Sequence, residues 1–348
     1  MLKAVFDAYG FNQDTSTAKA FGSGLINHTW KVSGDKEDYI LQRINNQVFK
    51  KPFDIAYNIS SIAAYLQQHF PEYFFVSPIK TNDGTDIFYN QHDDYFRLSP
   101  FVANSHTIDV VQTPSQAFGA ARQFGKFTKI LSGFDATQLK ITLPDFHNLS
   151  LRYQQFECAI AAGNPKRIQQ SVKLIEDIRA HKYIVEIFEG IKANPQFKLR
   201  VTHHDTKISN VLFDKQNKGI CIIDPDTIMP GYFISDVGDM LRTYLSPVSE
   251  EVNDFSQVSI RNDYFKAIAD GYLSEMKDEL TDEEIDHFLY AGKFMIYMQA
   301  LRFLTDHLKD DVYYGSLYEG HNYIRAGNQI ALLGQLIEKE AELISLIA

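Results

Sequence analysis

The first hundred residues carry a pattern typical of a small antiparallel sheet. Short apolar runs, each followed by turn residues such as Gly34-Asp35 and Asn82-Asp83-Gly84, predict strands. The predicted strands lie within residues 19–33, 38–45, 74–81, 87–90 and 95–103. Helices are predicted over residues 1–13 and 52–70, because Pro52 suits a first helical turn and an apolar stripe of Ile55, Ile59, Ile62 and Leu66 follows.

Beyond residue 103 the periodicity changes to that of helices. Helices are predicted at residues 116–131, within 143–162, and at 167–191, 259–276, 282–308 and 325–347. Thr281 and Glu284 form a capping-box pair at the start of the second-last of these. The pattern therefore predicts an α+β protein with a strand-rich region at 1–102 and a mainly helical region at 103–348.

Composition narrows the class of protein. The chain has 348 residues, 45% hydrophobic and 22% charged, which is typical of a globular protein with a large core. A net charge of -10 argues against non-specific nucleic-acid binding. No stretch approaches the roughly 18 apolar residues of a membrane span, and the N-terminus lacks the apolar core of a secretion signal. With only Cys158 and Cys221, a disulfide framework is not expected, and a cytoplasmic location is predicted.

The chemistry gathers in residues 201–226. His203, Asp205 and Asn210 stand as His-x-Asp-x-x-x-x-Asn, the order in which phosphoryl-transfer enzymes place a catalytic Asp and a magnesium-binding Asn. Two apolar runs, 211–213 and 220–223, predict a hairpin that returns Asp224 towards Asn210. Asp205 suits a base that orients a hydroxyl, and the oxygens of Asn210 and Asp224 suit Mg²⁺. The alternative, that these are ordinary polar loop residues, is less consistent with the spacing and the hairpin.

Four segments in order along the chain carry a family resemblance. VTHHDTKISN, IIDPDTIMPG, DVGDMLR and LRFLTDHLKDDVYY resemble the aminoglycoside phosphotransferase and choline kinase superfamily, and within it most closely the N-acetylhexosamine 1-kinases. The resemblance spans nearly the whole chain and implies a two-lobed protein-kinase-like fold. It also implies ATP and Mg²⁺ as cofactors and a small sugar as the partner; no oligomeric state follows.

The resemblance assigns roles to single residues. Asp205 is expected to contact the sugar and act as base on its anomeric hydroxyl, and Arg302 and Tyr313 are expected sugar contacts for N-acetylglucosamine or N-acetylgalactosamine. Asn210 and Asp224 are the expected magnesium ligands. One position departs from the family: Leu25 stands where a histidine often follows the glycine turn, so the preference for this sugar is open.

The nucleotide is expected to lie against the first hairpin. Gly22, Ser23 and Gly24 form a turn whose backbone N–H groups can approach phosphates, although such a turn is also common in plain hairpins. Arg43 takes the place of the usual third-strand lysine; the alternative is an exposed strand residue. The helix at 52–70 has no Glu to pair with it, so that either Asn58 or Asp54 substitutes or the ion pair is absent.

Two other functions stay open at this point. A kinase of the same fold for another small hydroxyl compound, such as an aminoglycoside, choline or a different sugar, would keep Asp205, Asn210 and Asp224. A nucleotide-binding module without catalysis is the second alternative, motivated by the missing Glu and the missing lysine.

Overall fold

The computed structural model describes residues 2–12, 15–22, 24, 26–34 and 37–347. They form two compact units, which are Met1–Ile108 with Ile130–Pro144 and Asn210–Pro230, and Asp109–Lys129 with Asp145–Ser209 and Gly231–Ala348. The predicted boundary at residues 102 and 103 divides the chain once. In the structure, the first unit ends its first segment at Ile108 and also contains two segments from later in the chain, Ile130–Pro144 and Asn210–Pro230.

The first unit is built on an antiparallel sheet. Over the described residues this sheet has five strands in the order β1-β2-β3-β5-β4. The strands are β1 (Thr17–Ala20), β2 (His28–Ser33), β3 (Asp38–Ile44), β4 (Phe88–Tyr89) and β5 (Tyr95–Pro100). Residues 74–81 do not form the predicted strand; only Ile79 bridges to Leu98. Pro78 precedes Ile79 and lacks the N–H group that a strand ladder requires.

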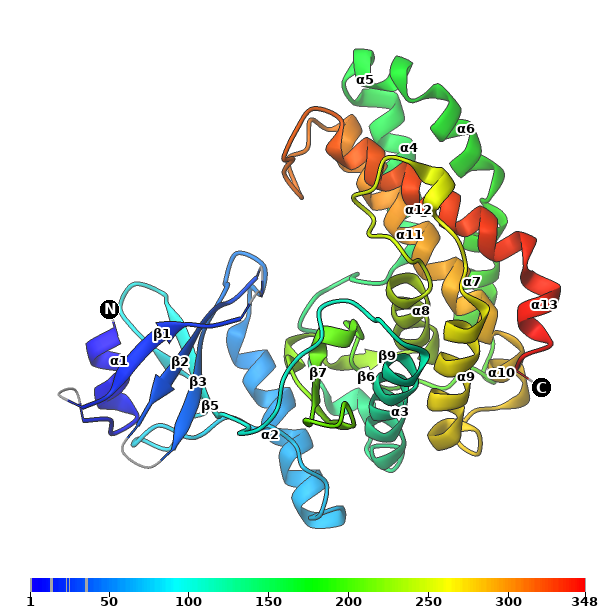
Figure 1. Cartoon of the computed structure of the whole chain (residues 1–348). Helices are drawn as coiled ribbons and strands as arrows, with labels where there is room; N and C mark the ends of the chain where they lie inside the picture. The colour runs from blue at the N-terminus through cyan, green and yellow to red at the C-terminus, as the bar shows by residue number, and fades with distance from the viewer. Residues whose placement is uncertain (1, 13–14, 23, 25, 35–36, 348) are drawn as a thin grey trace. The chain divides into compact units, whose positions relative to one another are not determined.

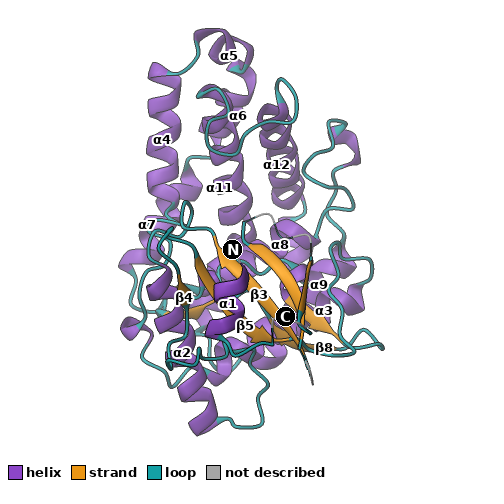
Figure 2. Cartoon of the chain, turned by 90° about the vertical axis from the view of Figure 1, so that its left-hand side faces the viewer, coloured by secondary structure: helices purple, strands orange, loops and turns teal. Residues whose placement is uncertain are grey.

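Two helices pack against this sheet, and each forms a hydrophobic cluster with it. Helix α1 (Leu2–Ala8) buries Val5 and Phe6 against Leu41 and Leu98, and Figure 2 shows α1 lying over β3 and β5. Helix α2 (Pro52–His69) begins with Pro52, as predicted, and buries its apolar stripe in a second cluster with Ile44 of β3. Because neighbouring residues of a strand point to opposite faces, Leu41 and Ile44 contact different helices.

A hairpin and short turns complete the first unit. The segment at 210–230 forms β7 (Val211–Phe213) and β8 (Gly219–Ile222), with the 3-10 turn η3 (Pro225–Thr227) after them. Residues 130–144 carry the 3-10 turn η1 (Ala136–Gln138).

The second unit is mainly helical, which together with the sheet of the first unit confirms the predicted α+β class. Its elements include β6 (Arg200–Thr202), and β9 (Met229–Gly231) ends at its Gly231. Its helices are α3 (Pro114–Ile130, up to Lys129), α4 (Leu149–Ala162), α5 (Pro165–Gln170), α6 (Val172–Ala180), α7 (Tyr183–Ala193), α8 (Phe233–Tyr244), α9 (Asn262–Met276), α10 (Asp282–Asp286), α11 (Phe288–Leu308), α12 (His321–Glu338) and α13 (Glu340–Ile344).

Helix α11 is the centre of this unit. It is buried along most of its length and packs beside α4, α8 and α12 (Figure 1). Gly125 of α3 allows close packing on α9, because an added Cβ would lie 2.9 Å from the Tyr272 carbonyl oxygen. The Thr281–Glu284 capping box is confirmed, and it starts α10.

The helix predicted at 167–191 is divided into α5, α6 and α7. Breaks fall at Ser171 and at His181-Lys182, and the Tyr297 hydroxyl of α11 donates to the Ile178 carbonyl near the end of α6. Periodicity alone did not show these breaks, because tertiary hydrogen bonds satisfy the carbonyls that they free. Within the described chain, no helix has the length and apolar character needed to cross a membrane.

Candidate functional site

The loop that carries Asp205 belongs to the second unit. It follows β6, and its His204 adopts a left-handed backbone conformation (φ 65°) immediately before Asp205. An added Cβ at Gly231 would lie 2.3 Å from Thr202 Oγ1 and 2.5 Å from His204 Nε2. Glycine at 231 is therefore what lets the His204 ring pack against this part of the chain.

Two aspartates of α8 hold this loop through its backbone. The N–H groups of His203 and His204 donate to the two oxygens of Asp236 at 2.9 and 2.7 Å. The Thr206 N–H donates to Asp239 Oδ2 at 2.8 Å. Asp205 therefore lies between residues that are both anchored to α8.

Burial raises the pKa values of the two aspartates that hold the loop. Burial raises the pKa of Asp236 to about 7, against the opposing effect of the two backbone donors. Burial also raises the pKa of Asp239, opposed by the Arg242 guanidinium and aided by the charge of Asp205. Two buried carboxyls with raised pKa values therefore lie close to a third carboxyl, Asp205, as is common at functional sites.

Asp205 itself is partly exposed. Its side chain is 26% accessible, and Lys207 Nζ lies 2.9 Å from Asp205 Oδ2. An accessible carboxylate at an anchored position can accept a proton from a hydroxyl group of a substrate. Lys207 was not singled out in the sequence, although its place two residues after Asp205 was visible there.

Asn210 and Asp224 belong to the first unit, where the hairpin brings them together. The strands β7 and β8 pair Val211 with Ile222, and the Ile223 N–H donates to the Asn210 carbonyl at 2.9 Å. Asp224 is the next residue, with a left-handed backbone (φ 59°) and a side chain that is 37% exposed. The hairpin predicted from the apolar runs therefore places Asp224 beside Asn210.

The donor set fits a magnesium ion that also binds phosphates. One amide oxygen and one carboxylate come from adjacent positions of the hairpin, and Mg²⁺ in such sites takes few protein ligands because phosphate oxygens and water complete its shell. Among the described residues, no group of three or more His, Cys, Asp or Glu side chains gathers as a candidate metal site.

Arg97 and Asp226 form a buried ion pair in the same unit. Both side chains are 3% exposed, and Arg97 Nη1 contacts Asp226 Oδ1. Asn27 Nδ2 donates to the other oxygen of Asp226 at 2.7 Å, and Arg97 Nη2 lies 3.9 Å from Asp224 Oδ1. Sequence reasoning missed Arg97 and Asn27. No local motif marks them, since they meet Asp226 only through the fold.

Arg43 lies on the opposite face of the sheet from Arg97. It forms an ion pair with Asp94 at 3.4 Å, and its β5 partner is Phe96. Arg97, by contrast, is opposite Gln42, and its Nε and Nη2 donate to Gln42 Oε1 at 2.9 and 2.8 Å. Asn58 is fully buried and binds the backbone of Lys140 and Ile228. The role of Arg43 towards phosphate stays a prediction.

The glycine turn is only partly described. Gly22 has a left-handed backbone (φ 80°), which favours glycine. Among the described residues, no atom lies within 4 Å of a Cβ added at Gly22 or Gly24. Ser23, predicted to bind nucleotide, and Leu25, the departure from the family, lie outside the described residues.

Arg302 and Tyr313 are neighbours in the second unit. Arg302 Nη2 lies 3.4 Å from the Tyr313 hydroxyl, and the guanidinium packs over the rings of Phe146, Tyr313 and Tyr314. The Tyr313 side chain is 73% exposed. An arginine beside an exposed tyrosine can bind a sugar, because the ring offers an apolar face and the guanidinium offers donors.

A line of rings joins this pair to the loop that carries Asp205. The His147 ring stacks on Phe146 at 4.4 Å and lies 5.2 Å from the ring of His204, which precedes Asp205. Burial, together with His204 and Arg302, holds the pKa of His147 well below its usual range. Asp205, Arg302 and Tyr313, predicted at distant points of the sequence, therefore belong to one continuous region of the second unit.

This chain is similar to several known proteins. A family model described as the phosphotransferase enzyme family matches residues 17–266. An amicoumacin kinase solved with AMP-PNP, Ca²⁺ and amicoumacin is 13% identical, with a TM-score of 0.65 over 96% of this chain and 92% of that chain.

Two further solved structures share the fold. A spectinomycin phosphotransferase in complex with ADP and spectinomycin is 13% identical, with a TM-score of 0.60 over 97% of each chain. A microcompartment-associated aminopropanol kinase is 12% identical, with a TM-score of 0.63 over 98% of this chain and 97% of that chain. The protein-kinase-like fold class is thereby confirmed.

Proposed function

Since the chain belongs to the phosphotransferase enzyme family, we propose that it transfers the γ-phosphoryl group of ATP to the anomeric hydroxyl of N-acetylglucosamine or N-acetylgalactosamine. The observation that carries the transfer chemistry is the Ile223 N–H bond to the Asn210 carbonyl, which places Asp224 beside Asn210. The anchored loop around Asp205 supplies the base. Similar folds solved with AMP-PNP and Ca²⁺, or with ADP, support a nucleotide and a divalent cation as cofactors.

The proposed roles follow from the side chains. Asp205 accepts the proton of the acceptor hydroxyl while that oxygen forms a bond to the γ-phosphorus and the bond to the ADP oxygen breaks. Asn210 and Asp224 would hold Mg²⁺, which when bound neutralises charge on the phosphates. Lys207, paired with Asp205, adds a positive charge beside the base.

The acceptor assignment rests on the sequence segments and on the second unit. Arg302 and Tyr313 lie together, are joined to the catalytic loop by aromatic contacts, and present an exposed ring and donors suited to an acetamido sugar. A second candidate is a kinase for another small hydroxyl compound, because the same fold occurs in an aminopropanol kinase and in antibiotic phosphotransferases.

The proposal is tested by ADP release with Mg-ATP and a panel of acceptors. The panel contains N-acetylglucosamine, N-acetylgalactosamine, glucose, galactose, choline and kanamycin. We expect turnover with the two acetamido sugars and an anomeric phosphate as product. Asp205→Asn should lower kcat by about 100-fold or more, whereas Asp270→Asn, the same change at an exposed surface pair, should leave it unchanged.

Other outcomes separate the alternatives. Turnover with choline, kanamycin or another sugar alone would keep the mechanism and replace the acceptor. ATP binding without turnover on any acceptor would support a nucleotide-binding module and contradict the proposed function.

A further inference from the structure

The segment between α11 and α12 carries Tyr313 and has an unusual backbone. Asp310 and Asp311 both adopt left-handed conformations (φ 62° and 60°), which aspartate takes only at some energetic cost. Such a segment keeps its shape only where the surrounding contacts fix it. The same segment exposes Tyr313 to solvent at 73%.

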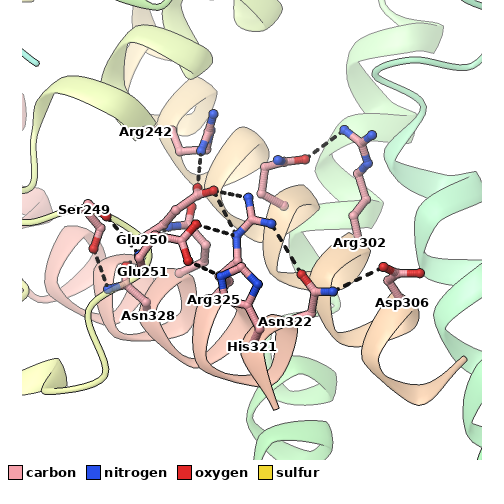
Figure 3. A network of polar contacts seen from close by, with 12 residues as sticks. Arg242, Ser249, Glu250, Glu251, Arg302, Asp306, His321, Asn322, Arg325 and Asn328 are labelled. Carbon is pink, nitrogen blue, oxygen red and sulfur yellow. Dashed lines mark hydrogen bonds and ion pairs between the residues drawn. The ribbon is translucent and has the colours of Figure 1, made fainter. Parts of the chain in front are cut away.

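Asp306 and Asn322 supply those contacts. The two oxygens of Asp306 accept the N–H groups of Tyr313 and Tyr314 at 2.7 and 2.8 Å. The Asn322 amide nitrogen lies 2.9 Å from Asp311 Oδ1, 2.9 Å from the Gly315 carbonyl and 3.3 Å from Asp306 Oδ2 (Figure 3 shows the Asp306 contact). Asn322 is fully buried, so its contacts are made without competition from water.

Asn322 also connects the Tyr313 segment to charged residues, through its side-chain oxygen. Its Oδ1 accepts from Arg325 Nη1 at 3.3 Å, and Arg325 in turn contacts Glu250 Oε1 (Figure 3). The other oxygen of Glu250 accepts from Arg242 at 2.9 Å. A single chain of polar contacts therefore runs from the Tyr313 segment to α8.

This series of polar contacts ends at the loop that carries Asp205. Arg242 donates to Asp239 Oδ1 at 3.2 Å, and Asp239 Oδ2 accepts the N–H of Thr206, the residue after Asp205. Burial would raise the pKa of Glu250, but Arg242 and Arg325 outweigh it and hold that pKa below its usual range. Glu250 thus stays ionised between the two arginines, and the contact chain keeps both of its ion pairs.

We propose that Asn322 is a positioning residue for the acceptor. It holds the Tyr313 segment in its left-handed conformation. Its contacts through Arg325, Glu250 and Arg242 fix the position of this segment relative to the loop that carries Asp205. This inference rests on the proposed function, because it takes Tyr313 as an acceptor contact. It adds a residue that touches neither acceptor nor nucleotide and that controls acceptor affinity.

Asn322→Asp is the sharpest variant. It keeps the shape of the side chain but replaces the donating amide by a carboxylate facing Asp306 and Asp311, so that attraction becomes repulsion. We expect the acceptor KM to rise about tenfold or more, the cost of losing a buried hydrogen-bond donor. The KM for ATP should not change, and kcat should fall no more than about threefold. Asn322→Ala serves as a second variant that introduces no charge.

Lys293→Met is the matched control. It removes the ion pair of the buried Lys293 with the partly exposed Glu340 in the same helical bundle, at a position nine residues before Arg302 in α11. We expect it to lower the thermal midpoint without changing the acceptor KM. Equal KM changes in Asn322→Asp and Lys293→Met, or an unchanged acceptor KM in both Asn322 variants, would overturn the proposal.

Hydrogen exchange measured by mass spectrometry makes the test independent of turnover. The amides of Tyr313 and Tyr314 should exchange faster in both Asn322 variants than in the wild type, and should not do so in Lys293→Met. If the wild type is inert with every acceptor, the proposed function fails. The positioning role is then decided by exchange alone, and unchanged exchange over residues 311–315 overturns it.

Discussion

At the scale of single residues, this protein depends on buried carboxyls that support a partly exposed one. Asp236 has no solvent contact and accepts two backbone N–H groups of the loop that carries Asp205, while Asp205 is accessible. The sequence showed both residue types and their order. It did not show that Asp236 is buried, which is the cause of its pKa shift.

The pKa of Asp236 predicts a dependence of stability on pH. This pKa is near 3.8 in the unfolded chain and about 7 in the fold, so the folded state binds the proton more tightly. The stabilisation is complete below about pH 4 and is lost as the pH rises through about 7. The urea midpoint of the wild type should therefore fall, relative to that of Asp236→Asn, as the pH rises from 5 to 8.

Asp236→Asn is the reference because asparagine carries no titrating proton. Its own stability is expected to be lower at every pH, since an amide cannot accept both N–H groups as a carboxyl does. Parallel midpoint curves for the two proteins over this pH range would contradict the assigned pKa.

At the scale of elements, contacts between neighbouring segments could be predicted from the sequence, whereas contacts between distant segments could not. The β7–β8 hairpin forms between runs that are adjacent in sequence, so the position of Asp224 beside Asn210 was predictable. The ion pair of Arg97 with Asp226 joins β5 to η3 across more than a hundred residues. No sequence pattern within either element indicates such a partner.

Removing one partner of this ion pair is expected to lower the free energy of unfolding strongly. Arg97→Met leaves the Asp226 carboxylate buried without its arginine, which should reduce the free energy of unfolding by about 3–5 kcal/mol. Adding Asp226→Asn should restore much of that loss, because no unpaired charge then remains. Urea denaturation of the single and double variants measures both effects.

Lys31→Met is the control for this experiment. Lys31 and Asp38 also form an ion pair between strands of the same sheet, but their side chains are 30% and 37% exposed. Its loss should change the free energy of unfolding by no more than about 1 kcal/mol. Equal losses for Arg97→Met and Lys31→Met would show that the burial of the Arg97 pair has no energetic consequence.

At the scale of the whole molecule, the expected functional residues are divided between the two units. Asn210 and Asp224 lie in the first unit, and Asp205, Arg302 and Tyr313 lie in the second. A ligand that binds only the folded chain stabilises all of it, so nucleotide binding can be followed by thermal unfolding.

Asp224 is expected to make that stabilisation depend on magnesium. With Mg-ATP at about 100 times its Kd, the wild type should gain about 2.7 kcal/mol, seen as a higher unfolding temperature. Chelation of Mg²⁺ by EDTA should remove most of this gain, and Asp224→Asn should show little gain with or without EDTA. Asp83→Asn, the same change at an exposed turn of the first unit, should behave as the wild type. A full magnesium-dependent gain in Asp224→Asn would rule out this carboxylate as a ligand.

The sequence by itself determined the elements and the order of the chemistry. Strand and helix periodicity, the apolar hairpin and the spacing of Asp205, Asn210 and Asp224 all depend on residues close together in the chain, where side-chain pattern and backbone preference act directly. The α+β class and the phosphotransferase family could be predicted for this reason. Errors fell at residues 74–81, where Pro78 interrupts the predicted strand, and in the helices predicted at 167–191, 282–308 and 325–347, which the structure divides into shorter ones.

Only the tertiary structure decided which residues support the site. Arg97 meets Asp226, and Asn322 reaches Asp306 and Asp311, because folding removes water and brings distant side chains within hydrogen-bond distance. Burial then determines the charge of Asp236 and the strength of each pair, and neither burial nor distance is encoded in a local pattern.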